Sequence, residues 1–421
     1  YRQIRKSLTA GRTQCYFGKQ DIHLPVNMAD VKSLYPFVMN TYNFPKAQYQ
    51  YTQDYVSGKL GIYRVRVLHQ RLKWDNPMLI RTQFEKLFKM CPELRASFPE
   101  NSVKYAPVII PKRSEKNDEA LNWDHRGEME IFLSSVDIEE ILLNGGDVEV
   151  ITDGWKEGAS GIYWDLDSDE TFKTYIEPLM IDKTKQDELK AKGLPYNEAQ
   201  READKIALNV LSGKVIQRLF EDVNINLKTI KDVDNFIEKT EPETRQIETY
   251  GKNLILGTGK MKLECLEGQK MRAIYYGIFI YAFARRYMYR TLLNKYIVFY
   301  EDTDSAVMPK FEWERFMSLN AGLIPINRTG QFGDLEEEVG NANRIITIRP
   351  KCYYVRNEEK PKKTKRRFKG VKTNDCWMEK REWDRCEILE RRLPADIVDY
   401  IMEFLPDHSY TYVPDRVIRN K

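Results

Sequence analysis

The sequence predicts an α+β protein with a β-hairpin that carries carboxylates and with long helices. Three observations predict this class: an acidic hairpin at 295–309, a strand-to-helix turn around Asp30, and two long helical segments at 172–220 and 269–293. At 421 residues the chain exceeds one typical core, so two or three subdomains are expected.

The hairpin is the most informative stretch. Residues 297–300 are apolar, β-branched or aromatic, and 305–308 form a second strand. Four turn-favouring residues lie between them: Glu301, Asp302, Thr303 and Asp304. Carboxylates this close resist joint ionisation, and a divalent cation relieves their repulsion. Oxygen ligands favour Mg²⁺ or Mn²⁺ over zinc. The alternative is an acidic exposed turn, which is more common for an isolated Asp-Thr-Asp.

Composition narrows the functional classes. The net charge of +4 arises from 67 basic and 63 acidic residues, so the distribution of charge matters more than its total. Six scattered cysteines without a C-x-x-C pair predict reduced thiols in an intracellular protein. The longest apolar run, 273–284, is too short to span a bilayer, and no membrane partner is expected. Because the chain starts at Tyr1 without Met, we expect a fragment.

The first forty residues hold a basic segment and a strand. Ala10-Gly11 breaks the basic segment, which predicts either a backbone turn that approaches a phosphate or a plain loop. A strand ending at Asp30 precedes a helix that opens near Ser33, a plausible N-cap, with Pro36 in its first turn.

The middle of the chain is mixed. Residues 61–68 alternate like a strand, 108–111 predict a short strand end, and 131–133 predict a strand followed by a helix at 136–143. No chemistry follows from this region. Residues 221–268 are polar and predict a surface insertion, and 269–293 predict a buried helix.

The helical segment 172–220 is broken by a loop at 193–195. An apolar stripe predicts its core face: Leu208, Leu211, Val215 and Leu219. Lys205, Asn209 and Ser212 share an adjacent face, and Gly213 suggests close packing. Lys183 and Lys185 on the preceding helix predict either an anion site or solvated surface lysines.

The C-terminal part is basic. Residues 349–355 predict a strand with Lys351 and Tyr353 on one face. Eight of the thirteen residues at 360–372 are basic, which is typical of a solvated loop, a targeting signal or a phosphate-backbone contact. An amphipathic helix pair is expected at 387–405.

These stretches resemble the ordered motifs of family B DNA polymerases. Asp30–Pro36 resembles motif A, 205–214 motif B and 300–305 motif C. Three shorter stretches are similar to the exonuclease–polymerase linker, the K-x-Y motif and the K-G-V stretch: 5–12, 351–353 and 368–371. Lys205 follows Asp30 by about 175 residues, and Asp302 follows Asn209 by about 93. Both spacings leave room for insertions, as in the protein-primed branch of the family, which the chain therefore resembles.

The resemblance implies a right-hand fold with an antiparallel palm sheet, helical fingers and a small thumb. Its implied parts are a linker (1–20), a first palm part with motif A (21–60), a palm insertion (61–170), fingers with motif B (171–225), a surface insertion (226–268), a second palm part with motif C and K-x-Y (269–375), and a thumb (376–421).

The resemblance also implies a site that binds two Mg²⁺ or Mn²⁺ ions. The implied catalytic carboxylates are Asp30, Asp302 and Asp304, with Asp30, Asp304 and the carbonyl of Val31 as metal ligands. The implied nucleotide-binding residues are Tyr35 as steric gate, Lys183, Lys205, Asn209 and Gly213. The implied DNA-binding residues are Gly11, Arg12, Lys351, Tyr353, Arg366, Arg367 and Lys369.

The implied function is DNA-templated synthesis from deoxynucleotides on a primer-template, with a terminal priming protein as a further partner. The sequence departs from the family at Ser212, where Tyr is usual, and at Val210, where Ser is common. We also expect no exonuclease domain, because residues 1–20 are too few to hold one. Two alternatives are a DNA-binding remnant without turnover and an RNA-directed or template-independent polymerase.

Overall fold

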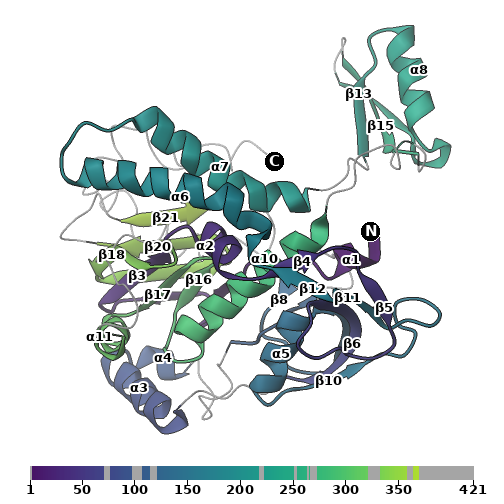
Figure 1. Cartoon of the computed structure of the whole chain (residues 1–421). Coiled ribbons are helices and arrows are strands. Elements are labelled where there is room, and N and C mark those ends of the chain that lie inside the picture. The colour runs from purple at the N-terminus through teal and green to yellow at the C-terminus, as the bar shows by residue number, and fades with distance from the viewer. Residues whose placement is uncertain are drawn as a thin grey trace.

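The computed structural model describes residues 2–70, 76–96, 107–113, 121–217, 222–250, 254–262, 265, 273–320, 332–357 and 364–368. Helices and sheets alternate along the chain, and every strand pairing in these ranges is antiparallel, which confirms the predicted α+β class (Figure 1). None of the helices described is long and apolar enough to cross a membrane. The predicted thumb (376–421) and helix pair (387–405) lie outside the described residues.

A five-stranded sheet forms the centre of the molecule. Its strands, in spatial order, are β1 (Thr13–Cys15), β16 (Tyr300–Asp302), β17 (Ser305–Pro309), β3 (Val26–Val31) and β18 (Leu335–Ala342). Strand β17 is buried along its whole length, and the inner residues of β3 are equally enclosed. Helix α11 (Lys310–Leu319) follows β17 directly and packs on β17 and β3.

A second sheet lies beside the first. Its strands are β2 (Gln20–Ile22), β19 (Arg344–Arg349), β20 (Cys352–Arg356) and β21 (Lys365–Phe368). Contacts of β1 with β19 and of β18 with β20 join the two sheets.

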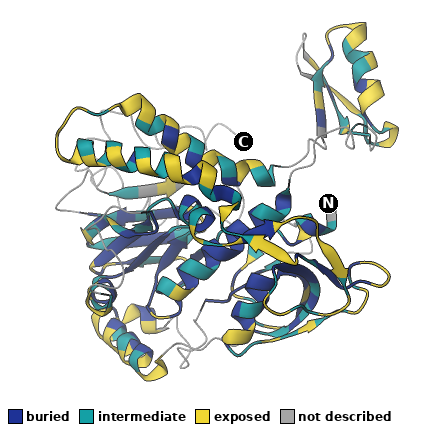
Figure 2. Ribbon diagram, in the orientation of Figure 1, coloured by how far each residue is buried: buried dark blue, intermediate teal, exposed yellow. Residues whose placement is uncertain are grey.

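Helix α10 (Ile274–Met288) is the predicted buried helix, and it is buried over most of its length (Figure 2). It continues into a π-helical turn, η3 (Tyr289–Leu293). Its neighbours come from three parts of the chain: α1 (Arg2–Lys6), α2 (Leu34–Thr41), α5 (Ser135–Leu143) and α7 (Glu198–Ile216). An all-round apolar sequence is what such a central helix requires.

Residues 44–168, apart from two helices, form a unit around a curved sheet with α5 packed on it (Figure 1). The curved sheet contains β5 (Gln50–Thr52), β6 (Gly61–His69), β9 (Met129–Ser134), β10 (Asp147–Val150) and β11 (Gly161–Tyr163). Two further pairs are β4 (Phe44–Lys46) with β12 (Leu166–Ser168), and β7 (Lys112–Arg113) with β8 (Leu121–Asn122). The two helices, α3 (Pro77–Met90) and α4 (Glu93–Ala96), lie instead near α11, where the Lys86 ammonium is 4.7 Å from the centre of the Phe311 ring. The predicted strand at 61–68 and the strand-then-helix at 131–143 are confirmed. The strand predicted at 108–111 is wrong, because the Val108 and Ile109 carbonyls accept side-chain hydrogen bonds from Arg12 instead of pairing in a sheet.

Helices α6 (Glu170–Ala191) and α7 form an antiparallel pair, with the predicted break between them. The Asn197 side chain caps α7 by accepting a hydrogen bond from the Gln200 amide (3.1 Å). Of the predicted stripe, Leu208 is buried, Leu211 and Val215 are half-buried, and Leu219 lies outside the described residues.

The polar segment after α7 is a folded unit rather than a simple surface loop. It comprises β13 (Asp222–Asn226), α8 (Ile230–Lys239), the 3₁₀ turn η2 (Pro242–Thr244), β14 (Gln246–Tyr250) and β15 (Leu254–Lys260). Its three-stranded sheet and α8 enclose a core of their own around Val223, Leu227 and Phe236. Its first strand begins at Asp222, within the polar segment 221–268 that the sequence predicts as an insertion.

Candidate active site

The acidic hairpin closes with a two-residue turn. Asp302 pairs with Ser305, so only Thr303 and Asp304 lie between the strands, and Glu301 and Asp302 belong to β16. The predicted four-residue turn is therefore wrong. The turn is tight because Thr303 adopts a left-handed conformation (φ 67°), which is rare for a β-branched residue.

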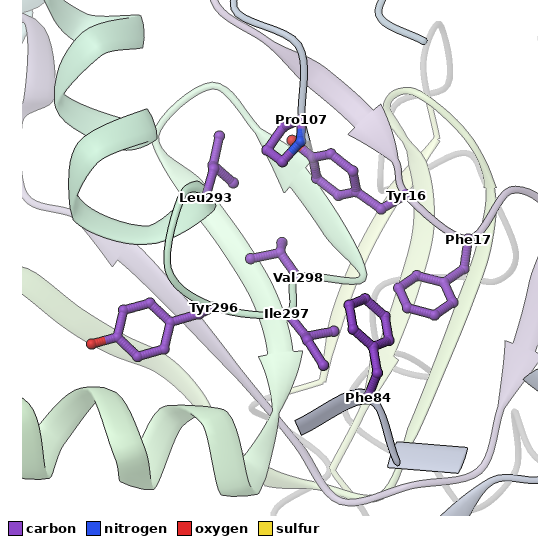
Figure 3. A pocket seen from close by; sticks show the side chains of 8 residues that line it. All are labelled: Tyr16, Phe17, Phe84, Pro107, Leu293, Tyr296, Ile297 and Val298. Atoms are coloured by element: carbon purple, nitrogen blue, oxygen red, sulfur yellow. The ribbon is translucent and has the colours of Figure 1, made fainter. Parts of the chain in front are cut away.

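The residues before β16 do not form the predicted strand from 297. Ile297 and Val298 are buried in an irregular segment, where they line a small apolar pocket with Tyr16 and Phe84 (Figure 3). The pocket, with a cavity of about 20 Å³, has room for about one water molecule. It is a packing feature behind the hairpin rather than a substrate site.

Backbone register places two of the predicted carboxylates in one row. The row crosses the five strands through Thr13, Asp302, Ser305, Asp30 and Glu336. Directly paired residues of adjacent strands project from the same face of a sheet. Two aspartates that are far apart in sequence therefore share one face, separated by a single serine.

Asp304 lies beside this row. Its backbone carbonyl accepts a hydrogen bond from the Val31 amide (2.7 Å), which ties the hairpin turn to the residue after Asp30. Burial, followed by the charge of Asp304, raises the pKa of Asp30 well above its usual range. Burial also raises the pKa of Asp304, with the charge of Asp302 adding to it. The two carboxylates are thus close enough to oppose each other's ionisation.

The K-x-Y residues border the row, in an arrangement that differs from the prediction. Lys351 lies in the β19–β20 turn with a positive φ of 61°, not on a strand, and its ammonium group contacts the Asp302 carboxylate. Its amide donates to the Tyr300 hydroxyl (2.8 Å). Tyr353 is buried on β20, with its ring 4.3 Å from that of Tyr300. The turn therefore places Lys351 beside Asp302, while Tyr353 packs against Tyr300, the residue that binds the Lys351 amide.

Tyr35 lies on the first turn of α2, directly after the strand that carries Asp30. Its ring packs edge-on against Tyr281 at 5.0 Å. Burial, Tyr281 and the charge of Asp304 raise the pKa of its hydroxyl. Ser33 occupies the predicted N-cap position but makes no capping side-chain hydrogen bond. The structure therefore brings Tyr35 within electrostatic reach of the carboxylates.

Comparison with known proteins identifies the family. Residues 1–296 match the family model described as DNA polymerase type B, organellar and viral. The chain belongs to this family. No curated protein matches the chain.

Solved structures agree with this assignment at the level of the fold. The chain resembles Phi29 DNA polymerase complexed with primer-template DNA (TM-score 0.53, 19% identity, 84% of this chain and 49% of that chain). It also resembles the ternary complex of that enzyme with incoming nucleotide substrates (TM-score 0.54, 18% identity, 85% and 51%). The chain spans about half the length of these relatives.

The motif B residues of this type B chain lie apart from the carboxylate row, on the exposed face of α7. Lys205 is half-exposed and pairs with Glu202 at 3.4 Å, and Asn209 is exposed. A side chain at Gly213 would meet open space, so the close packing predicted there is wrong. Ser212 points to the buried side of α7 and its hydroxyl donates to the Asn209 carbonyl (3.0 Å). The prediction that Ser212 shares one face with Lys205 and Asn209 is therefore wrong.

Lys183 is neither a solvated lysine nor an unpaired anion ligand. It is buried, donates to Asp187 (2.9 Å) and lies 5.2 Å from the centre of the Phe332 ring. The Asp187 carboxylate also accepts from Arg201 (2.6 Å) and lies 3.8 Å from Lys32. Three cations thus surround one carboxylate at the junction of α6, α7 and the loop that follows Asp30.

Two of the predicted DNA contacts serve the interior. Arg12 is buried, forms an ion pair with Glu301 (3.9 Å) and stacks over Trp123 (4.8 Å), so its guanidinium is not available to a phosphate. A Cβ on Gly11 would lie 2.6 Å from the Cγ2 of Thr303. Gly11 therefore lets the chain approach the hairpin turn, which is a different role from the predicted approach to DNA.

The remaining basic residues lie on β21. Arg367 is exposed and pairs in register with Tyr353, and Arg366 pairs with Tyr354. The side chain of Arg366 and the whole of Lys369 lie outside the described residues. The described part of the basic run is therefore an edge strand of the second sheet rather than a loop.

Two charged residues near the row, Glu338 and Lys365, were not predicted from the sequence. Glu338 on β18 influences the pKa of Asp30 and pairs with Lys365 of β21. The run of three glutamates at 336–338 was the available signal, but only the sheet order shows which of them lie near Asp30.

The donor set suits an oxygen-preferring cation. Asp30 and Asp304 are two half-buried carboxylates that resist joint ionisation, and bound Mg²⁺ or Mn²⁺ would stabilise their charged forms. In the part of the chain that the structure describes, no three His, Cys, Asp or Glu side chains already form a complete metal cluster. Asp302, now paired with Lys351, would have to supply any third carboxylate.

Proposed function

We propose that the chain catalyses DNA-templated DNA synthesis, adding deoxynucleotides to a primer 3′-hydroxyl or to a hydroxyl of a priming protein. The observation that carries this proposal is the convergence of Asp30 and Asp304 at one end of the inner strands of the central sheet, with Asp302 in the same row as Asp30. Family membership and the likeness to Phi29 DNA polymerase support it.

Two divalent ions, when bound, would activate the attacking hydroxyl and stabilise the departing pyrophosphate. Asp30, Asp304 and the carbonyl of Val31 would hold them, because these groups offer oxygen ligands at one end of β3 and at the turn bound to it. Asp302 would act as a supporting carboxylate, held in place by Lys351 and by the Thr13 hydroxyl (3.3 Å).

The incoming nucleotide would lie between the sheet and α7. Lys205 and Lys183 would neutralise its triphosphate, and Lys183 would exchange its contact with Asp187 for a phosphate oxygen. The open space at Gly213 and the exposed Asn209 leave room for a base pair. Tyr35, beside the carboxylates, would exclude a ribose 2′-hydroxyl.

The primer-template would follow the turn and edge strand of the second sheet. Lys351 and Tyr353 would hold the primer end, and Arg366, Arg367 and Lys369 would contact the duplex backbone without reading its sequence. Phi29 DNA polymerase is described with primer-template DNA and incoming nucleotides, and we propose the same partners here. A terminal priming protein, and an intracellular role in replicating a viral or plasmid-like linear DNA, complete the proposal.

Primer extension tests this function. Wild type and Asp304→Asn are compared on a primed DNA template with deoxynucleotides and Mg²⁺, then Mn²⁺. We expect wild type to extend the primer and the variant to lose this activity, while both proteins bind the primer-template equally. Binding by both proteins without extension by either would favour a non-catalytic DNA-binding remnant. Replacing the DNA template by RNA, or omitting it, tests the RNA-directed and template-independent alternatives.

A further inference from the structure

The hairpin turn between Asp302 and Asp304 needs external support. Thr303 holds a left-handed conformation, which is unfavourable for a β-branched residue and persists only where neighbouring structure enforces it. Its amide donates to the Arg12 carbonyl (2.7 Å), and its methyl group fits against Gly11. The segment before β1 is therefore the support of the turn.

One buried arginine fixes that segment. Arg285, on α10, is 5% exposed and donates through one terminal nitrogen to the carbonyls of Thr9 and Ala10 (3.2 Å to Ala10). Its other terminal nitrogen donates to both carboxylate oxygens of Asp137 on α5, at 2.9 and 2.8 Å. The Ser134 hydroxyl donates a further hydrogen bond to Asp137 (2.8 Å). Asp137 thus orients the guanidinium from one side, and on the other side the guanidinium binds the backbone carbonyls of Thr9 and Ala10.

Stability alone is a weak reason for this arrangement. A buried ion pair often contributes little net stability, because desolvation of both charges offsets their attraction. The planar guanidinium, in contrast, gives fixed directions to several hydrogen bonds at once, which a lysine cannot do. The contacts made by Arg285 therefore specify position more than they add stability.

We propose that Arg285, oriented by Asp137, is a positioning residue that holds the Thr9–Arg12 segment against the hairpin turn and so places Asp302 and Asp304. This inference rests on the proposed polymerase function for its effect on rate, but not for its effect on the turn. It assigns the 44–168 unit, through α5, a part in shaping the carboxylate site.

Arg285→Lys is the test, because lysine can keep the charge pair with Asp137 but not the fork that also reaches the backbone. Arg286→Lys is the matched control. Arg286 is the next residue of α10 and contacts the same helix, at Glu139 (2.9 Å), Glu140 (3.3 Å) and the Val136 carbonyl. Among the described residues, Arg286 forms its hydrogen bonds and ion pairs with α5 and not with the segment before β1.

Two readouts separate positioning from folding. Hydrogen exchange of the Thr303 amide should accelerate at least tenfold in Arg285→Lys and stay unchanged in Arg286→Lys, with similar melting temperatures. In primer extension, kcat should fall about tenfold to a hundredfold in Arg285→Lys, as misplacement of reacting groups by about 1 Å predicts, with KM for deoxynucleotides unchanged. Asp137→Asn, which removes the group that orients Arg285, should give the same pattern and serves if Arg285→Lys does not fold.

Thr303 exchange that is equal in wild type, Arg285→Lys and Asp137→Asn would overturn the inference. So would a loss of kcat of the same size in Arg286→Lys. If wild type does not extend primers at all, the proposed function fails, and the exchange result alone still decides whether Arg285 positions the turn.

Discussion

The carboxylate sheet and the α6–α7 pair are built by different means. In the sheet, Asp30 and Asp302 meet through pairing of strands far apart in the sequence, and the carboxylates are half-buried. On α7, Lys205 and Asn209 lie on an exposed face, and the charged contacts of the helix pair are mostly local. Under the proposed function, the charged groups of the chemical step would lie where strand pairing fixes the backbone, and the groups that bind the nucleotide would lie on the exposed face of a helix.

Because of this difference, substitutions in the two regions should have different effects on stability and on rate. A buried carboxylate without a cation opposes folding, because it is removed from water and repelled by its neighbour. An exposed charge on a helix contributes little to stability in either direction. Substitutions in the sheet should therefore alter stability and rate together, whereas those on the exposed face of α7 should alter ligand affinity with little change in stability.

Asp30→Asn should show the largest effect. The variant loses a proposed metal ligand, so kcat for primer extension should fall by about a thousandfold or more. It should also melt at a higher temperature than wild type, because the repulsion between Asp30 and Asp304 is removed. Kinetics and calorimetry measure the two effects.

Glu188→Gln, an exposed α6 residue, is the control for Asp30→Asn and should change neither value. A lower melting temperature in Asp30→Asn would show that the carboxylate stabilises the fold, against the contrast drawn here.

Gly277→Ala tests how α7 packs against α10, the buried helix of the body of the molecule. A Cβ on this α10 residue would lie 2.0 Å from the Cγ2 of Ile216 on α7, so the helices must separate. We expect the free energy of unfolding in urea to fall by about 1–3 kcal/mol. The double variant Gly277→Ala, Ile216→Ala should recover part of the loss. Equal losses in both variants would mean that α7 does not rest on α10 through this contact.

The sequence predicted the local parts of the site better than their assembly. The hairpin and the strand before Asp30 follow from short apolar runs next to turn residues. The row that joins Asp30 to Asp302 depends on strand register between distant segments, which no local pattern contains. Lys351 adopts a positive φ without a glycine to signal it, so its turn was taken for a strand.

The burial of Arg12 was not predicted from the sequence either. Arg12 lies in a basic segment and resembles a phosphate contact, yet Glu301, Trp123 and two carbonyls enclose it. Its partners come from three separate parts of the chain. A charged residue is predicted to be exposed unless its partners are known, and here only the fold identifies them.

The pH dependence of stability should have opposite signs in the two regions. Burial raises the pKa of Glu312, on α11 behind the hairpin, to about 7, against the opposing charge of Arg315. The native state then binds more protons than the unfolded state between 4.5 and about 7, so this contribution to stability is lost as the pH rises through that window. Urea unfolding from pH 5 to 8 should show wild type losing roughly 1–3 kcal/mol relative to Glu312→Gln.

Asp187, between α6 and α7, provides the opposite case. Burial opposes its ionisation, but hydrogen bonds from Lys183 and Arg201 outweigh burial and lower its pKa below 3.8. Its contribution is present above that value and is lost as the pH falls through the lowered pKa. Asp187→Asn should therefore be less stable than wild type at pH 6, with the difference shrinking toward pH 3. A difference that grows on acidification would contradict this assignment.

Gly213→Ala should have the smallest effect on stability and a separate effect on binding. The position is helical and open, so alanine should raise the free energy of unfolding by up to about 1 kcal/mol. If a base pair occupies that space, the added methyl group should raise KM for deoxynucleotides several-fold and leave kcat nearly unchanged. Ser212→Ala, on the buried side of α7, should leave KM as it is. An unchanged KM in Gly213→Ala would mean that the exposed face of α7 does not border the substrate, and the open helix would then need another ligand.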